Sequence, residues 1–182
     1  MPSAAFETAI LTVALYGVML IVLNMFSVVS QWVFIDSVKV RLGEVANQVA
    51  YEIANIYSMC RQSQGELQFF KPIEIPTEIS NYGYAVELRK IGEVWYVVTY
   101  LEANRAINAS SPIWRDPGVA VYVELTEGSF TITRSHGSYT VRHNAVLHSG
   151  VNIPVVWSSK TKTYTGDEII KVGLGWVEGS GG

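Results

Sequence analysis

Residues 5–35 read AFETAILTVALYGVMLIVLNMFSVVSQWVFI, and this apolar stretch is the strongest structural signal in the sequence. Glu7 and Asp36 flank a run of residues that contains no charge at all. A helix of this length exceeds the roughly 30 Å thickness of the hydrocarbon core of a bilayer. Because a helix that is apolar on every face must be surrounded by lipid or protein, the stretch predicts a membrane-spanning or assembly helix.

Residues 36–60 keep the helical period but change in character. Apolar residues recur at steps of three and four, and charged or amide side chains fall on the other faces. The stripe contains Val38, Leu42, Val45, Val49, Ile53, Ile56 and Cys60. No proline interrupts residues 4–57, so we expect one continuous helix that stops near Gly65. The stripe can pack on the chain's own domain, but its length favours contacts with other copies.

After Gly65 the apolar period switches from about 3.6 residues to two. Runs rich in Val, Tyr, Ile and Thr predict strands at 65–70, 82–90, 93–102, 118–126, 129–136, 138–146 and 167–177. Residues 102–116 are expected to form a longer loop. The predicted fold class is α+β, with a long N-terminal hydrophobic helix in residues 1–62 and an antiparallel β-sandwich-like (Ig-like) domain in residues 63–182. The segment from Gly65 onward is expected to be soluble and β-rich in isolation.

Composition excludes several function classes. The 182 residues carry a net charge of -3 with no Lys/Arg-rich patch, which argues against nucleic acid as a partner. Cys60 is the only cysteine, so no intrachain disulfide and no cysteine-based metal cluster can form. No G-x-S-x-G, P-loop or H-E-x-x-H motif is present, so we expect neither an enzyme nor a cofactor.

The apolar run headed by Phe6-Glu7, followed by the stem VRLGEVANQVAYEIANIY, resembles the archaeal type IV pilins and archaellins, the class III signal peptide family. The resemblance covers the first third of the chain. It implies an extracellular cell-surface filament for adhesion, a homopolymer that forms from a membrane-inserted precursor. A prepilin peptidase, an assembly ATPase and a platform protein are implied as partners. The implied assembly positions are Phe6, Glu7, Leu11, Leu15, Val18, Leu20, Val22, Phe26, Trp32, Leu42, Val45, Val49 and Ile53.

The chain departs from the precursor pattern of that family at its beginning. No Lys or Arg precedes the apolar run, and Lys39 and Arg41 follow it. By the positive-inside tendency alone, the β domain would lie in the cytoplasm. Either a basic leader has been removed or the charge bias is overridden, and the mature N-terminus depends on which of the two holds.

Several single residues have a functional and an ordinary interpretation. Glu7 either pairs with a neighbouring subunit's terminal amine or complements the helix dipole. Asn108 begins the sequon Asn108-Ala-Ser110, which makes it a candidate for N-glycosylation in a surface loop. His136, His143 and His148 are more readily solvent-facing strand residues than metal ligands. Cys60 is expected to pack at the base of the β domain.

Two other functions compete with the filament. A single-span membrane-anchored β-sandwich protein, similar to the archaellum stator proteins or to pseudopilins, needs only the uncharged run. A binding module for sugars or a surface layer would place the function in the β domain.

Overall fold

The computed structural model describes residues 3–65, 67–113, 121–134, 137–162, 164 and 167–178. Its packing divides the chain into two compact units, Met1–Ser37 and Val38–Gly182. The predicted division after residue 62 coincides with the end of the helix. The compact unit begins 25 residues earlier, at Val38, because the stem belongs to the domain by packing.

Helix α1 spans Ser3–Gln62 as 60 continuous residues, as the sequence predicted. Its last turn carries Arg61, a favourable position for a cation at the negative end of the helix dipole. The chain then turns at Ser63, whose hydroxyl donates to the Cys60 carbonyl, and at Gly65, whose φ is 86°. The buried Lys160 donates to the Ser63 carbonyl at 3.0 Å, and its ammonium pairs with Glu168 at 2.8 Å.

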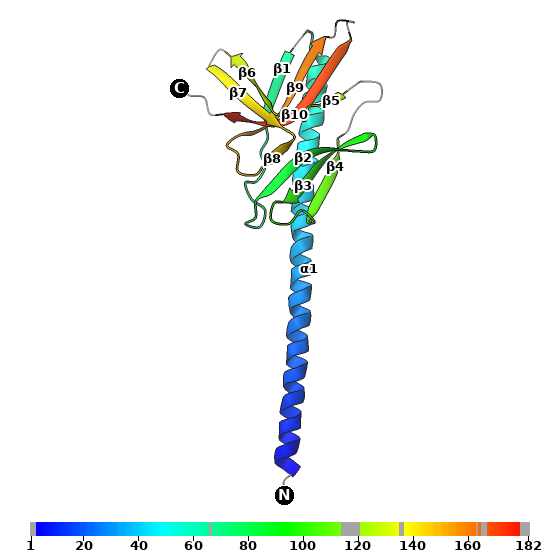
Figure 1. Cartoon of the computed structure of the whole chain (residues 1–182), viewed down its shortest axis with the longest axis vertical. Coiled ribbons are helices and arrows are strands. Elements are labelled where there is room, and N and C mark those ends of the chain that lie inside the picture. Colours follow the sequence, from blue (N-terminus) through cyan, green and yellow to red (C-terminus); the bar gives the residue numbers. More distant parts are fainter. Residues whose placement is uncertain are drawn as a thin grey trace. The chain divides into compact units, whose positions relative to one another are not determined.

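The strands that follow form two sheets (Figure 1). The six-stranded sheet has the order β1-β9-β10-β7-β6, with β5 also paired to β10, and the four-stranded sheet has the order β4-β3-β2-β8. The bounds are β1 Leu67–Pro72, β2 Tyr84–Ile91, β3 Val94–Leu101, β4 Asn108–Pro112, β5 Val121–Val123, β6 Gly128–Arg134, β7 Gly137–Asn144, β8 Val146–His148, β9 Pro154–Lys162 and β10 Glu168–Glu178. All described strand pairs are antiparallel except β5 with β10, which is parallel.

One hydrophobic core joins the stem of α1 to both sheets. Leu42, Val49 and Ile53 of the stem lie in the same buried cluster as Val86 of β2 and Val172 of β10. Every member of the predicted stripe is buried. The argument that the stripe is too long for the chain's own domain is therefore wrong, because both sheets together cover it down to Cys60. Cys60 is buried in the same core.

A second, smaller core covers the other face of the six-stranded sheet. Trp157 of β9 packs edge-on against Phe130 of β6, with ring centroids 5.3 Å apart. The indole lies over Gly173 of β10, where a Cβ atom would be only 2.7 Å from its Nε1. A glycine fits here because any side chain would occupy the space of the indole ring. Gly173 lies within strand β10.

The strand prediction missed one central element. Strand β9 pairs with β1 on one side and with β10 on the other, yet its sequence PVVWSSKTK was not recognised as a strand. Its apolar part is short, and Ser158, Ser159 and Lys160 are polar although they are buried. Strand β4 lies within the expected loop of residues 102–116, so the expectation that this stretch is all loop is wrong.

Candidate functional site: the apolar segment of α1

The apolar segment, residues 6–35 of α1, exposes its side chains on every face. Its large apolar side chains from Phe6 to Phe34 are 43–74% exposed. By contrast, soluble helices usually bury an apolar stripe and expose a polar one. An exposed surface of this extent indicates a partner that is lipid, protein or both in turn.

By length and composition, α1 can cross a membrane. Its most apolar window has a mean hydropathy of 2.3, and none of that window is buried. Because all backbone bonds of a helix are internal, such a segment is stable in hydrocarbon without a polar partner. Lys39 and Arg41 are the first basic residues after the segment, and both are exposed.

The predicted assembly positions fall into two groups. The side chains in the apolar segment are exposed: Phe6, Glu7, Leu11, Leu15, Val18, Leu20, Val22, Phe26 and Trp32. The side chains in the stem are buried in the domain core: Leu42, Val45, Val49 and Ile53. Only the first group is available for contacts with another molecule, so the stem positions are structural within the subunit.

Polar side chains inside the apolar segment bond back to their own helix. The Thr12 hydroxyl donates to the Thr8 carbonyl at 2.7 Å, and Asn24 Nδ2 donates to the Leu20 carbonyl at 2.8 Å. This arrangement shields the donors from an apolar environment. The second amide proton and the Oδ1 atom of Asn24 make no hydrogen bond with the described residues, so they can bond a neighbouring helix.

A shallow groove lies near the beginning of the apolar segment. It is lined by two small residues, Ala9 and Ala14, and by the larger Ile10 and Val13. Gly17 follows on the same helix, and a Cβ atom there would meet nothing within 4 Å. Small side chains allow the backbones of two helices to approach closely.

Glu7 lies one turn further into α1 than the dipole interpretation requires. The helix begins at Ser3, and its first turn contains no acidic residue. Since the dipole effect falls off within the first turn, stabilisation by the dipole is weak at this position. Glu7 is exposed at the start of the apolar segment.

Asn108 is the first residue of β4, not part of a loop. Its side chain is exposed, and Nδ2 donates to the Arg105 carbonyl at 2.9 Å. Among the described strands, β4 lies at the edge of its sheet next to β3, so the described part of the chain leaves the sequon accessible. Glycosylation at Asn108 stays a prediction.

The described histidines lie in different sheets. His143 of β7 packs 4.9 Å from Trp157, centroid to centroid, and its Nδ1 lies 3.0 Å from the Thr126 carbonyl oxygen. His148 of β8 pairs with Glu102. His136 lies outside the described residues. Among the residues that the structure describes, no group of three or more His, Cys, Asp or Glu side chains is arranged to hold a metal ion.

Comparisons with protein families, with curated proteins and with solved structures found no match for this chain.

Proposed function

We propose that this chain is a structural subunit of an extracellular, type IV pilus-like filament for surface adhesion, and that it polymerises through the apolar segment of α1. The observation that carries the proposal is the exposure of large apolar side chains on every face of residues 6–34. A helix bundle formed by many copies would surround each such helix with others. A helix that is apolar on every face is better accounted for by contacts on all sides than by a single docking face.

The membrane is the first environment of the segment in this proposal. Residues 8–35 carry no charge and satisfy the length of a bilayer span. Lipid chains and apolar side chains are similar solvents for such a helix, so leaving lipid for a helix bundle gains little from the hydrophobic effect. The transfer then depends on close packing and on an external source of energy. This requirement agrees with the assembly ATPase and platform protein that the resemblance implies.

Contacts between copies would come from the apolar segment and from the outer surface of the domain. The stem contributes little, because its apolar stripe is buried within the chain. Its outward face still exposes Val40, Tyr51 and Met59 at 57%, 69% and 53%. These three side chains are available to the apolar segment of a neighbouring copy.

A single-span membrane-anchored protein is the second candidate. The specific observation in its favour is the complete burial of the stem stripe, because a buried stripe is no longer an argument for polymerisation. In this case residues 6–35 are the anchor and the β domain is the working part.

Replacement of Leu20 by Asp tests whether the apolar segment packs in a filament core. An unpaired carboxylate in the middle of a helix bundle is strongly unfavourable, so the variant should form no filaments. Membrane insertion costs about 3 kcal/mol more with one central charge, which the remaining apolar residues offset. We therefore expect Leu20→Asp in the membrane fraction and absent from the sheared surface fraction. The Leu23→Asp variant should behave alike.

The matched control is Asn47→Asp, which adds the same charge to an exposed position of the stem. It should leave filaments and membrane insertion unchanged. Normal filaments from Leu20→Asp would contradict the packing of this segment in a filament core. If the unchanged chain is found only in the membrane, the anchor becomes the better account.

A further inference from the structure

The outer face of the four-stranded sheet contains a hollow of about 370 Å³, which we call the β2–β4 hollow. Its lining includes Arg89, Val98, Tyr100, Arg105, Asn108 and Ser110. The strand register places these residues on one face, since Val98 is opposite Ser110 and Tyr100 is opposite Asn108. The opposite face of the same sheet packs on the stem, so the hollow faces away from the core.

Arg105 contacts an aromatic ring but has no charged partner among the residues that the structure describes. Its guanidinium carbon lies 5.0 Å from the centroid of the Tyr100 ring, so one face of the guanidinium stacks on a buried aromatic ring. The guanidinium forms no hydrogen bond or ion pair with any residue in the described ranges. Its N–H donors are therefore oriented by the stacking and remain available to an anion.

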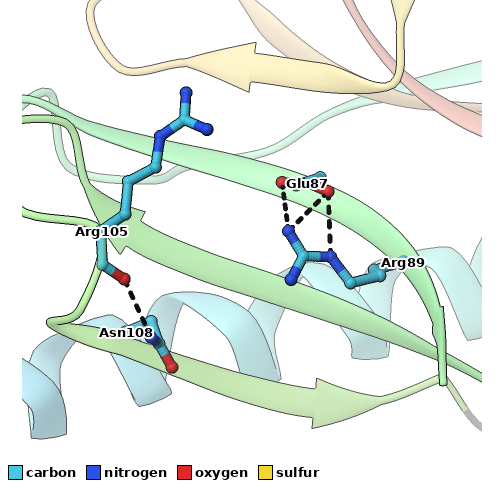
Figure 2. A network of polar contacts seen from close by, with 4 residues as sticks. All are labelled: Glu87, Arg89, Arg105 and Asn108. Atoms are coloured by element: carbon cyan, nitrogen blue, oxygen red, sulfur yellow. Dashed lines mark hydrogen bonds and ion pairs between the residues drawn. The ribbon is translucent and has the colours of Figure 1, made fainter.

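The guanidinium group of Arg89 uses only some of its hydrogen-bond donors within the described residues. Its Nε and Nη2 atoms donate to the Glu87 carboxylate at 2.9–3.1 Å, as Figure 2 shows. Nη1, the other terminal nitrogen, makes no bond within the part of the chain that the structure describes. Among the described residues, two guanidinium groups and one carboxylate leave one positive charge at the hollow, although the whole chain carries -3. None of the described lining residues is acidic.

The remaining lining groups suit hydroxyl-bearing ligands. The Ser110 hydroxyl and the Asn108 carboxamide are exposed at the edge of the hollow, and Asn108 lies beside Arg105 in Figure 2. Asn108 Nδ2 is held by the Arg105 carbonyl, which leaves Oδ1 as an acceptor. Ile91, which also lines the hollow and is 52% exposed, supplies an apolar surface for C–H groups. Convergent polar groups around an apolar floor are typical of a small-molecule site.

We propose that the β2–β4 hollow binds a carboxylated sugar residue. The carboxylate would lie against Arg105, because the planar guanidinium matches a carboxylate with two parallel hydrogen bonds. The sugar hydroxyls would bond Asn108 and Ser110. A single excess positive charge favours a monoanionic carboxylate over a phosphate dianion. This inference does not depend on polymerisation, because all its residues belong to strands β2–β4 and to the β3–β4 connection of one chain.

The test uses the full chain in detergent micelles, produced in a host without N-glycosylation so that Asn108 is unmodified. Saturation-transfer NMR with glucuronate, glucose, acetate and inorganic phosphate measures binding to the hollow. We expect saturable millimolar binding of glucuronate and at least tenfold weaker binding of the other three. Arg105→Gln should weaken the binding of glucuronate at least tenfold. Arg105→Lys should keep only part of the affinity, because an ammonium group cannot form the two parallel hydrogen bonds of the planar guanidinium.

Lys90→Gln is the matched control, since it removes a positive charge next to Arg89 from a side chain that alternation directs to the other face. It should leave the affinity unchanged, and thermal unfolding should show that all variants are folded. Equal affinity for glucose would overturn the role of the carboxylate. Equal affinity for acetate or phosphate would show that the sugar part of the ligand is not recognised and that the hollow is a general anion site. Absence of saturable binding, or an unchanged affinity in Arg105→Gln, would overturn the proposal as a whole.

Discussion

The hydroxyl of Thr99 on β3 donates a 2.9 Å hydrogen bond to the backbone carbonyl of Leu42 in α1, and both residues are completely buried. Two further bonds join the stem to the residues around β1. Gln48 Nε2 donates to the Glu74 carbonyl at 2.7 Å, and Lys71 pairs with Glu52 at 2.6 Å. The stem is therefore part of the domain by hydrogen bonding as well as by burial.

The fragment that folds should begin at Val38, not at Gly65. A fragment of residues 65–182 lacks Leu42, Val49 and Ile53, so the core faces of both sheets would be exposed. We expect residues 38–182 to be soluble, with helix and strand signals in circular dichroism, and residues 65–182 to aggregate. A soluble, cooperatively unfolding 65–182 fragment would show that the sheets do not need the stem.

Replacement of Thr99 by Val should destabilise the chain by about 1 kcal/mol, because the side chain keeps its shape and loses a buried hydrogen bond. The Leu42 carbonyl can keep its helical bond, which limits the loss. Denaturant unfolding of the full chain in detergent measures the effect. Thr131→Val is the control, since Thr131 is exposed on β6 and its hydroxyl lies 3.3 Å from that of Thr140. Equal effects at the two positions would contradict a special role for the Thr99 bond.

Replacement of glycine by alanine should have opposite effects at two positions. At Gly173 the new Cβ would meet the Trp157 indole at 2.7 Å, so Gly173→Ala should destabilise by about 1–3 kcal/mol. At Gly43 in the stem, the nearest atom is the Ala109 Cβ at 3.9 Å, an ordinary contact. Gly43→Ala should stabilise by up to about 1 kcal/mol through helix propensity. Thermal unfolding of both variants checks the signs, and a tolerated alanine at Gly173 would show that the indole can move.

Stability should fall with pH above about 10 because of Tyr84. Burial raises the pKa of Tyr84 to about 12, and its hydroxyl donates to the Pro76 carbonyl. Between about pH 10 and 12 the unfolded chain releases a proton that the folded chain retains. The free energy of unfolding should therefore decrease across this window by on the order of 2 kcal/mol from this residue.

Urea unfolding at pH 9, 10 and 11 measures this slope. Tyr84→Phe should reduce it, because the variant has no proton to lose at this position. Tyr122→Phe, which changes an exposed tyrosine, is the control and should keep the slope of the unchanged chain. The same slope in all three proteins would assign the pH dependence to other groups.

The period of the apolar residues was sufficient to predict the long helix, but it was insufficient to predict how the elements pack. The absence of charge in residues 8–35 and the three- and four-residue steps of the stem predicted α1 correctly. Strand β9 escaped prediction because Lys160 is buried through partners that lie 97 and 8 positions away, at Ser63 and Glu168. Local sequence carries no signal of such partners.

For the candidate sites too, some residues follow from the sequence alone and others depend on the packing of the chain. The exposed positions of the apolar segment follow from composition alone, because every face is apolar. The stem positions were assigned to assembly because a stripe does not reveal which surface covers it. The β2–β4 hollow was not predicted, since it depends on the register that places Tyr100 opposite Asn108 and on the stacking of Arg105.

Electron microscopy of the sheared cell-surface fraction, with mass spectrometry of the same fraction, tests the central claim most directly. If the chain polymerises through the apolar segment, we expect uniform thin filaments in which this chain is the main protein and the apolar segments of neighbouring copies pack together in the interior. Recovery of the chain only from the detergent-soluble membrane fraction, with no filament that contains it, would contradict polymerisation and identify residues 6–35 as an anchor.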